Sequence, residues 1–352
     1  MRIAYGIHGY ARGHASRALG ILPQLSNHDI LILAGGDAHA LLSLAGFNVK
    51  EIPTFRYIYS KGSSKYSKTS TVLENLPLLH DLFFSGSSYD MISGTIQNFK
   101  PDLVISDSEP WTQRVANEQR VPLLSFDHYG IFAYCNWDMP THYRLQRALA
   151  CAVYKTYMGN PDKIIASAFY PAIPKDEKIF VVGPIIRNEV KRATPTNGNH
   201  LVVYLNNNLN RFAEELESCL INSGYEIHVY GAGQTDRREN LTFLPVDPLK
   251  FVEDLASCRA VISSAGNQLI GETLWLRKPV LAIPENSIDQ RLNALGIETM
   301  EVGMISHVNE ITSATITNFL GNEEKYRENC EKHARDSTDE VVLMVNQFLD
   351  EI

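Results

Sequence analysis

Residues 263–294, SSAGNQLIGETLWLRKPVLAIPENSIDQRLNA, decide the fold of this chain of 352 residues. The apolar run at 258–262 predicts a buried strand, and the two serines and Gly266 that follow predict a turn into an amphipathic helix. A Lys-Pro pair ends that helix, and residues 280–284 predict the next strand. A turn from a strand into a helix presents unpaired N–H groups and the positive end of the helix dipole, so it can bind an anion.

Short apolar runs alternate with helix-like stretches along the rest of the chain, and this alternation predicts parallel α/β sheets. In the first half we expect strands at residues 2–5, 29–33, 103–105, 123–125, 163–166 and 179–182. In the second half we expect strands at residues 201–205, 226–230, 241–244, 260–262 and 280–283. A polar run with proline and glycine at 191–198 separates the two series. The sequence therefore predicts two Rossmann-like, doubly wound domains, in which ligands bind at the carboxyl ends of the strands.

The bulk composition restricts the class of protein. Hydrophobic residues make up 44% and charged residues 20%, which suits packed cores, and the net charge of −8 argues against a dedicated nucleic-acid binder. Five widely spaced cysteines without a CxxC pair suggest neither a zinc ribbon nor a disulfide framework. The N-terminus lacks the apolar core of a signal peptide, and no stretch reaches the ~20 apolar residues of a membrane span. We expect a cytoplasmic enzyme in a reducing compartment.

The first predicted strand runs into a glycine-rich turn, Gly-Ile-His-Gly-Tyr-Ala-Arg-Gly, that opens a helix. Its glycines, Gly6, Gly9 and Gly13, follow the spacing G-x-x-G-x-x-x-G, whereas the dinucleotide fingerprint is G-x-G-x-x-G. No acidic residue ends the second predicted strand, since Asp37 comes late, after two glycines. The turn therefore argues against an NAD site.

His14, directly after this turn, is the leading candidate for a catalytic base because imidazole titrates near neutral pH. The alternatives are that it caps the helix or orients a phosphate, and His8 is a second candidate base. A base needs a group that fixes its tautomer. Asp107 follows a predicted strand whose carboxyl end lies at the same edge of the sheet, and Glu109 and Asp127 are alternatives or simple helix caps.

The residues of the 263–294 stretch follow an order that occurs in a known fold family. In order, the stretch carries Gly266, Glu272, Lys278-Pro279, Pro284, Asp289-Gln290 and Asn293-Ala294. This order resembles the C-terminal half of GT-B glycosyltransferases, especially family 28 (peptidoglycan N-acetylglucosaminyltransferase-like) and the UDP-glycosyltransferases. The Gly-His-Ala-Ser-Arg turn at 13–17 resembles the turn at the same place in those enzymes.

The resemblance implies an inverting, metal-independent hexosyltransferase that moves a sugar from a nucleotide-sugar, most simply a UDP-sugar, to a hydroxyl acceptor. It implies an acceptor-binding domain at 1–190, a donor-binding domain at 191–335 across a cleft, and a closing helix at 336–352 that packs back toward the first domain. The run Ser-Asp-Ser-Glu at 106–109 could pass for a metal motif, but it lies in the acceptor half. We expect no metal and no cofactor, with the nucleotide-sugar as substrate.

By position, the resemblance also assigns donor contacts. Arg17 and the helix N-terminus would hold the leaving diphosphate, and Glu272 would accept from the ribose hydroxyls. Asp289 and Gln290 would reach the donor sugar, and main-chain groups near Val246 would bind the base. The remaining expected donor contacts are Gly13, Asn206, Ser264, Ala265, Gly266 and Asn267.

The sequence departs from the family pattern after the first strand of the second half. Family members usually carry Gly and Ser there, whereas this chain carries Asn206-Asn207-Asn208. Asparagine tolerates the left-handed conformation and can donate to phosphate, so we expect Asn206 to serve as a donor contact.

Other features leave the acceptor open. Residues 55–70 carry four basic and no acidic side chains, which suits a surface loop or a lid that contacts an anionic acceptor. An aromatic stretch could belong to the core, or it could stack on acceptor rings or on lipid; it comprises Tyr129, Phe132, Tyr134, Trp137 and Tyr143. The acceptor could be a glycan, a lipid-linked sugar or a small molecule, with peripheral contact at the inner face of the membrane.

Two rival functions share the same fold. A nucleotide-sugar epimerase or hydrolase would break the donor bond without a separate sugar acceptor, because fold alone does not set the reaction. The second rival is a catalytically silent binder of nucleotide-sugars, and the joint presence of His14 and Glu272 argues against it. The sequence does not specify the sugar, the base, the acceptor or the oligomeric state.

Overall fold

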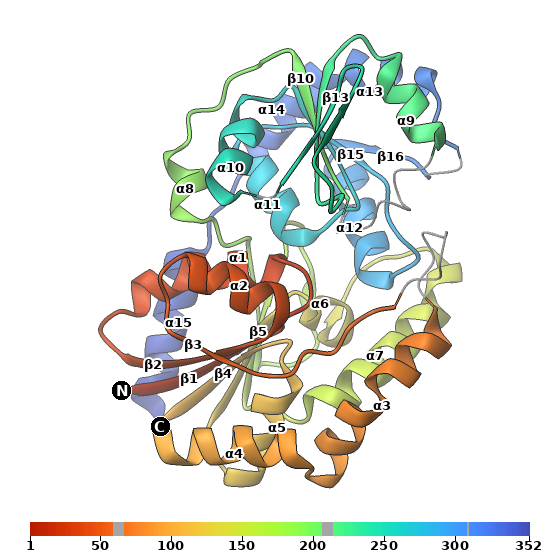
Figure 1. Ribbon diagram of the computed structural model, residues 1–352. Helices are drawn as coiled ribbons and strands as arrows, with labels where there is room; N and C mark the ends of the chain where they lie inside the picture. The colour runs from red at the N-terminus through yellow and green to blue at the C-terminus, as the bar shows by residue number, and fades with distance from the viewer. Residues whose placement is uncertain (59–66, 206–213, 246, 308–309) are drawn as a thin grey trace. The chain divides into compact units, whose positions relative to one another are not determined.

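The computed structural model describes residues 1–58, 67–205, 214–245, 247–307 and 310–352 (Figure 1). The chain forms two compact units, which are described separately. Within the described residues, the first unit comprises 1–58, 67–185 and 337–352, and the second lies between 186 and 336. The chain thus passes into the second unit after Ile185 and returns to the first at Ser337.

The first unit contains a parallel sheet of seven strands in the order β3-β2-β1-β4-β5-β7-β9. The strands are β1 (Arg2–Ile7), β2 (Asp29–Ala34), β3 (Val49–Glu51), β4 (Leu103–Asp107), β5 (Leu123–Asp127), β7 (Lys163–Ser167) and β9 (Ile179–Val182). All strands expected for the first half are present, and the short edge strand β3 was not expected. The strand order reverses between β1 and β4, where Ile7 pairs with Asp107. This reversal is where doubly wound sheets bind ligands.

Helices cover both faces of this sheet (Figure 1). They are α1 (Gly13–Ile21), α2 (Gly36–Leu44), α3 (Lys68–Phe84), α4 (Ser87–Phe99), α5 (Pro110–Gln119), α6 (Gly130–Tyr134), α7 (Arg144–Met158) and α15 (Thr338–Glu351), with 3-10 turns Leu22–Leu25 and Thr141–Tyr143. A two-stranded antiparallel ribbon, β6 (Cys135–Asn136) with β8 (Ile173–Pro174), completes the unit.

Successive side chains of β1 point to opposite faces of the sheet, so the first unit has a hydrophobic core on each face. Ile3, Tyr5 and Ile7 pack with α1, α2 and α15 on one face, and Ala4 packs with α4 and α5 on the other. Helix α15 takes part in the first core through apolar residues of its 341–349 stretch. The C-terminal helix is therefore part of the hydrophobic core that supports β1 and α1.

The second unit contains another sheet of seven strands, in the order β12-β13-β11-β10-β14-β15-β16. The strands are β10 (His200–Tyr204), β11 (Glu226–Tyr230), β12 (Asp236–Arg238), β13 (Leu241–Leu244), β14 (Ala260–Ser263), β15 (Val280–Ala282) and β16 (Gly303–Ile305). β12 is antiparallel to β13, and the other pairs are parallel. The five expected strands are present. The strand order reverses between β10 and β14, which directs attention to the turn after β14.

The helices of the second unit also lie on both faces of its sheet (Figure 1). They are α8 (Asn188–Arg192), α9 (Glu214–Ile221), α10 (Pro248–Ser257), α11 (Asn267–Trp275), α12 (Ile288–Thr299), α13 (Ser313–Gly321) and α14 (Glu323–His333). One core contains side chains of α9 and α13, and the other contains side chains of α8 and α10. None of the helices described in either unit has the length and apolarity that crossing a bilayer requires.

Candidate active site

The turns after β1, β4 and β14 each contain a residue in the strained left-handed backbone conformation. These three strands lie at the two points where the strand order reverses. Ala11 after β1, Ser108 after β4 and Ala265 after β14 have φ angles of 61°, 52° and 63°. An L-residue in the left-handed region costs roughly 1–2 kcal/mol, so the surrounding structure must hold these turns in place. Such strain gathers at functional sites, and it indicates the loops in which to look for chemistry.

A close backbone approach fixes the turn that leads to His14. A Cβ atom at Gly9 would lie 2.3 Å from the carbonyl oxygen of Gly35 and 2.2 Å from Oγ1 of Thr54. Only glycine fits there, because backbone cannot yield as a flexible side chain can. The turn after β1 is therefore packed tightly against the start of α2, and α1 begins at a fixed position.

His14 lies in the first turn of α1, and its imidazole contacts Asp107 at the end of β4. Nδ1 of His14 lies 2.7 Å from Oδ1 of Asp107. Arg17, one turn later on α1, donates from Nε to Oδ2 at 2.8 Å and from Nη2 to Oδ1 at 2.6 Å. The Asp107 side chain is fully buried, whereas that of His14 is 13% exposed. The first unit thus holds a histidine–aspartate pair whose carboxylate is neutralised by an arginine.

Asp107 determines which ring nitrogen of His14 carries the proton. Only a protonated Nδ1 donates to this carboxylate, so neutral His14 keeps a lone pair on Nε2. Burial raises the pKa of Asp107, but the charge of Arg17 and the contact with His14 lower it by more, and the net shift is downward. Asp107 therefore stays ionised at neutral pH, and it can stabilise the imidazolium that forms when Nε2 accepts a proton.

The other carboxylates considered from the sequence have different partners. Glu109 is the N-cap of α5 and accepts from two backbone N–H groups at 3.1 and 2.7 Å, and burial raises its pKa to about 7. Asp127 is buried, and burial raises its pKa as well. Its carboxylate accepts hydrogen bonds from Ser108, Gly130 and Tyr154. Of these three carboxylates, Asp107 is the one that contacts His14.

His8 lies beside His14 but is poorly suited to act as a base. The two ring centroids are 5.2 Å apart in an edge-on arrangement. Burial, and then the proximity of His14, lower the pKa of His8 to about 3. Imidazole with so low a pKa holds a proton too weakly to serve near neutral pH. The structure therefore favours His14 over His8 for proton transfer.

Aromatic side chains surround His14 on another side. The ring of Tyr129 lies 6.1 Å from that of His14, and Tyr129 is only half-buried. Behind it, Phe132 and Tyr154 are buried, and their ring centroids lie 5.6 and 6.2 Å from that of Tyr129. Part of the predicted aromatic stretch therefore belongs to the core, and Tyr129 lies beside the candidate base.

The turn after β14 leads into α11 as the sequence indicated. Gly266 is the N-cap of α11, and among the described residues no side chain caps that end. Ser263 accepts from the N–H of Ala265 at 3.2 Å, and Asn293 of α12 donates to the carbonyl of Ala265 at 2.9 Å. Asn293 is completely buried, so its place in the motif is explained by this support of the turn. The turn comprises the predicted donor contacts Ser264, Ala265, Gly266 and Asn267.

Glu272 lies on α11 within a buried ion pair that the sequence did not predict. Arg187 donates from Nε to Oε1 at 2.8 Å and from Nη2 to Oε2 at 2.9 Å, and Gln268 donates to Oε1 at 3.1 Å. Glu272 is 2% exposed. Because a carboxylate oxygen accepts two hydrogen bonds, Oε2 retains acceptor capacity for a further donor. The sequence shows Arg187 directly after an apolar Ile-Ile pair, but it contains no signal that identifies Glu272 as the partner.

The remaining predicted donor contacts lie after β15 or outside the described residues. Asp289 lies in the first turn of α12, and burial, helped by the charge of Glu285, raises its pKa to about 6. The side-chain amide of Gln290 donates to the carboxylate of Glu285 at 2.9 Å, and its oxygen accepts from the backbone N–H of Glu285 at 2.8 Å. Because β14 and β15 are parallel neighbours, Asp289 and Gln290 lie at the same carboxyl-terminal end of the strands as the turn after β14. Asn206 and Val246 lie outside the described residues.

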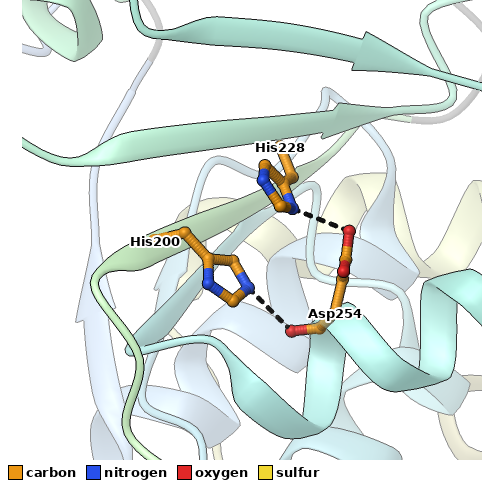
Figure 2. Close-up of side chains that lie close together, drawn as sticks. All are labelled: His200, His228 and Asp254. Atoms are coloured by element: carbon orange, nitrogen blue, oxygen red, sulfur yellow. Dashed lines mark hydrogen bonds and ion pairs between the residues drawn. The ribbon is translucent and has the colours of Figure 1, made fainter.

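One group of three possible metal ligands occurs in the described part of the chain: His200, His228 and Asp254, shown in Figure 2. Nδ1 of His228 lies 2.7 Å from Oδ2 of Asp254, which also accepts from Tyr230 at 2.6 Å, and Lys250 lies 2.8 Å from Oδ1. Both carboxylate oxygens of Asp254 therefore already have protein partners. His200 begins β10, so the group lies toward the amino ends of the strands, away from the turn after β14. We interpret it as a polar network that holds α10 on the sheet.

Comparisons with known proteins agree with this architecture. The family model described as Glycosyl transferase family 1 matches residues 1–323. Among curated proteins, none matches the chain. The solved structure of the calicheamicin glycosyltransferase CalG4 is 15% identical with a TM-score of 0.68, over 100% of this chain and 99% of that chain. MurG of Acinetobacter baumannii is 15% identical with a TM-score of 0.57, over 98% of this chain and 99% of that chain. The spinosyn rhamnosyltransferase SpnG, solved with spinosyn aglycone, is 14% identical with a TM-score of 0.59, over 98% of this chain and 100% of that chain.

Two Rossmann-like units with these likenesses define the GT-B fold. The chain belongs to Glycosyl transferase family 1, whose model spans most of its length. The resemblance inferred from the 13–17 turn and the 263–294 stretch is thereby confirmed. The protein is an enzyme whose reaction needs a sugar donor and an acceptor.

Proposed function

We propose that this protein is an inverting, metal-independent glycosyltransferase that moves a hexosyl group from a UDP-sugar to a hydroxyl group of the acceptor. The observation that carries the proposal is the pairing of His14 with buried Asp107 at the reversal of strand order. This arrangement supplies a general base with a fixed tautomer, which attack by a hydroxyl requires.

In the proposed reaction, Nε2 of His14 takes the proton from the acceptor hydroxyl as its oxygen attacks the anomeric carbon. The new carbon–oxygen bond forms while the bond to the nucleotide diphosphate breaks, and the diphosphate leaves with that electron pair. A single displacement of this kind inverts the anomeric configuration. Asp107 stabilises the imidazolium of His14, and Arg17 keeps Asp107 ionised.

We assign Arg17 this positioning role, although the sequence suggested contact with the diphosphate. Its Nε and Nη2 groups both donate to Asp107, and its side chain is 3% exposed. The backbone N–H groups at the Gly266–Asn267 helix start would then stabilise the leaving diphosphate in place of a metal ion.

The donor assignments in the second unit follow from its strand ends. Glu272 would accept from a ribose hydroxyl through the remaining capacity of Oε2, with Arg187 holding the carboxylate in place. Asp289 and Gln290, at the start of α12, would contact the donor sugar. Binding of the base near Val246 and of phosphate by Asn206 remain predictions from the family pattern.

Tyr129 would border the acceptor because its ring lies beside that of His14. A glycan, a lipid-linked sugar or a small hydroxylated molecule could present a face to this ring. We place the reaction in the cytoplasm. Five free cysteines without a disulfide suit a reducing compartment, and nucleotide-sugars would serve as donor substrates without a cofactor.

A panel of UDP-, GDP- and dTDP-sugars tests the proposal. We expect thermal stabilisation by UDP-sugars, product of inverted configuration by NMR, and the same rate with and without EDTA. Donor breakdown that is equally fast with and without acceptor would identify an epimerase or hydrolase instead. Loss of activity in EDTA would contradict metal independence, and no stabilisation by any sugar nucleotide would contradict the donor class.

A further inference from the structure

Protein donors fill most of the hydrogen-bonding capacity of the Glu272 carboxylate. Oε1 accepts from Nε of Arg187 at 2.8 Å and from the side-chain amide of Gln268 at 3.1 Å, whereas Oε2 accepts from Nη2 of Arg187 at 2.9 Å. Each carboxylate oxygen accepts two hydrogen bonds, so Oε1 is full and Oε2 can accept one more. Among the described residues, Arg187 and Gln268 are the ones that bond to this carboxylate. Glu272 therefore has one acceptor position left for a ligand.

The backbone on both sides of Arg187 is anchored within the second unit. Arg187 is the N-cap of α8, and its carbonyl accepts from the N–H of Lys191 at 3.0 Å. The preceding residue, Ile186, is completely buried in the core and donates its N–H to Oδ1 of Asp336 at 3.2 Å. Arg187 is therefore a fixed partner of Glu272 and not a surface side chain that meets it by chance.

The ion pair should persist when a ligand binds. The side chains of Arg187 and Glu272 are only 6% and 2% exposed. Separating them would leave two buried charges without partners, which costs more free energy than one additional hydroxyl contact returns. A ligand therefore meets the carboxylate with its single remaining position on Oε2.

This single position limits how Glu272 can hold a ribose. A ribose presents two neighbouring hydroxyl groups, 2′ and 3′, and a carboxylate that binds both needs an acceptor position for each. Glu272 has one such position, so it can bind one of the two hydroxyls. The other hydroxyl then makes no contact with Glu272, and its removal costs no hydrogen bond to this residue.

We propose that Arg187 determines donor specificity by restricting Glu272 to one ribose hydroxyl, and this rests on the function proposed above. The donor class then extends beyond ribonucleotides. Nucleoside diphosphate sugars of a deoxyribose should bind about as tightly as their ribose counterparts, provided that the missing hydroxyl is the one that Glu272 does not hold.

Calorimetric titration with UDP, 2′-deoxy-UDP and 3′-deoxy-UDP tests the proposal. We expect one analogue to bind within about threefold of UDP and the other about 10- to 100-fold more weakly, since it loses a hydrogen bond to a charged group. Weaker binding of both analogues would show that Glu272 holds both hydroxyls, and equal Kd values for all three nucleotides would show that it holds neither. Either result would overturn the proposal while UDP still binds. Failure of UDP itself to bind would contradict the proposed donor class, and this proposal with it.

Two variants test whether Arg187 sets the pattern. In Arg187→Lys, an ammonium group cannot form the two parallel bonds of a guanidinium, so a carboxylate position is freed for the second hydroxyl. The analogue that the wild type tolerates should then bind about tenfold more weakly than UDP, and an unchanged pattern would overturn the role of Arg187. In the double variant Arg187→Met, Glu272→Leu, all three nucleotides should bind with the same Kd, because the contact with the hydroxyl is gone.

The matched control is the double variant Arg259→Met, Glu323→Leu, the same exchange in another bidentate pair of the second unit. Arg259 donates to Glu323 at 2.6 and 2.5 Å, and it directly precedes β14, at the other end of that strand from the turn that leads to α11. This control should keep the wild-type order of Kd values. Equal Kd values for the three nucleotides in the control as well would overturn the proposal, because a general loosening of the second unit would then explain the effect.

Discussion

Replacement of Asp107 by Asn tests the role of the carboxylate beside His14. An amide has one oxygen, whereas Asp107 uses Oδ1 for His14 and Arg17 Nη2, and Oδ2 for Arg17 Nε. If the amide oxygen replaces Oδ2, the NH2 group meets Nδ1 of His14 and forces the imidazole proton onto Nε2. If the oxygen replaces Oδ1, the NH2 group faces the N–H of Arg17, donor against donor.

Either orientation therefore weakens the enzyme in a measurable way. Loss of general-base catalysis should lower kcat about 10²- to 10⁴-fold. The buried guanidinium of Arg17 also loses its counter-charge, which should cost roughly 3–5 kcal/mol in the free energy of unfolding. Turnover is measured on folded protein, with the folded fraction taken from urea unfolding and donor binding from calorimetry.

The control for Asp107→Asn is Asp236→Asn, the same exchange at an exposed carboxylate of β12. It should leave both kcat and the free energy of unfolding close to the wild-type values, because exposed ion pairs contribute little. A folded Asp107→Asn variant that retains kcat within about threefold of the wild type would refute the proposed role of the carboxylate, since both orientations remove the charge that stabilises the imidazolium of His14.

Three further predictions follow from the same contacts. Arg187→Ala should destabilise the chain by roughly 3–5 kcal/mol in urea unfolding, because Glu272 is left buried and unpaired. The double variant Arg187→Met, Glu272→Leu should recover most of the loss. If Arg187→Ala alone were as stable as the wild type, this prediction would be contradicted. Gly9→Ala should cost about 1–3 kcal/mol and lower kcat, because its Cβ would overlap the carbonyl of Gly35; unchanged stability would show that the turn can yield. The folded-state pKa of His8 is lowered from 6.5 to about 3, so the unfolded chain binds the proton between these pH values. The free energy of unfolding should therefore be highest above pH 6.5 and fall toward pH 3, by up to about 1.4 kcal/mol per pH unit. His8→Gln should flatten this pH dependence between pH 6.5 and 5.

The sequence predicted the central strands of both sheets because parallel strands buried on both faces read as apolar runs. It missed β3, β12 and β16, which are three residues long and lie at sheet edges. These three strands are short and partly or fully exposed, so none leaves an apolar run long enough to detect. Glycine turns and the Lys-Pro pair likewise indicated helix boundaries, because they act on the local backbone.

The pairing of His14 with Asp107 could be predicted, because both residues follow adjacent parallel strands whose carboxyl ends meet. The partners of Arg17 and Arg187 could not. Each arginine reaches a carboxylate about 90 residues away in sequence, 90 for Asp107 and 85 for Glu272. Local patterns do not encode which long side chain turns inward, and a buried guanidinium looks the same in sequence as an exposed one.

The measurement that tests the central claim most directly compares donor binding and turnover in wild type and His14→Ala. The side chain of His14 is partly exposed at its helix start, so the variant should fold. If His14 is the base, the variant should bind UDP-sugar with an unchanged Kd and lose about 10²-fold or more in kcat. Turnover near the wild-type rate, or loss of donor binding equal to the loss of turnover, would contradict the account.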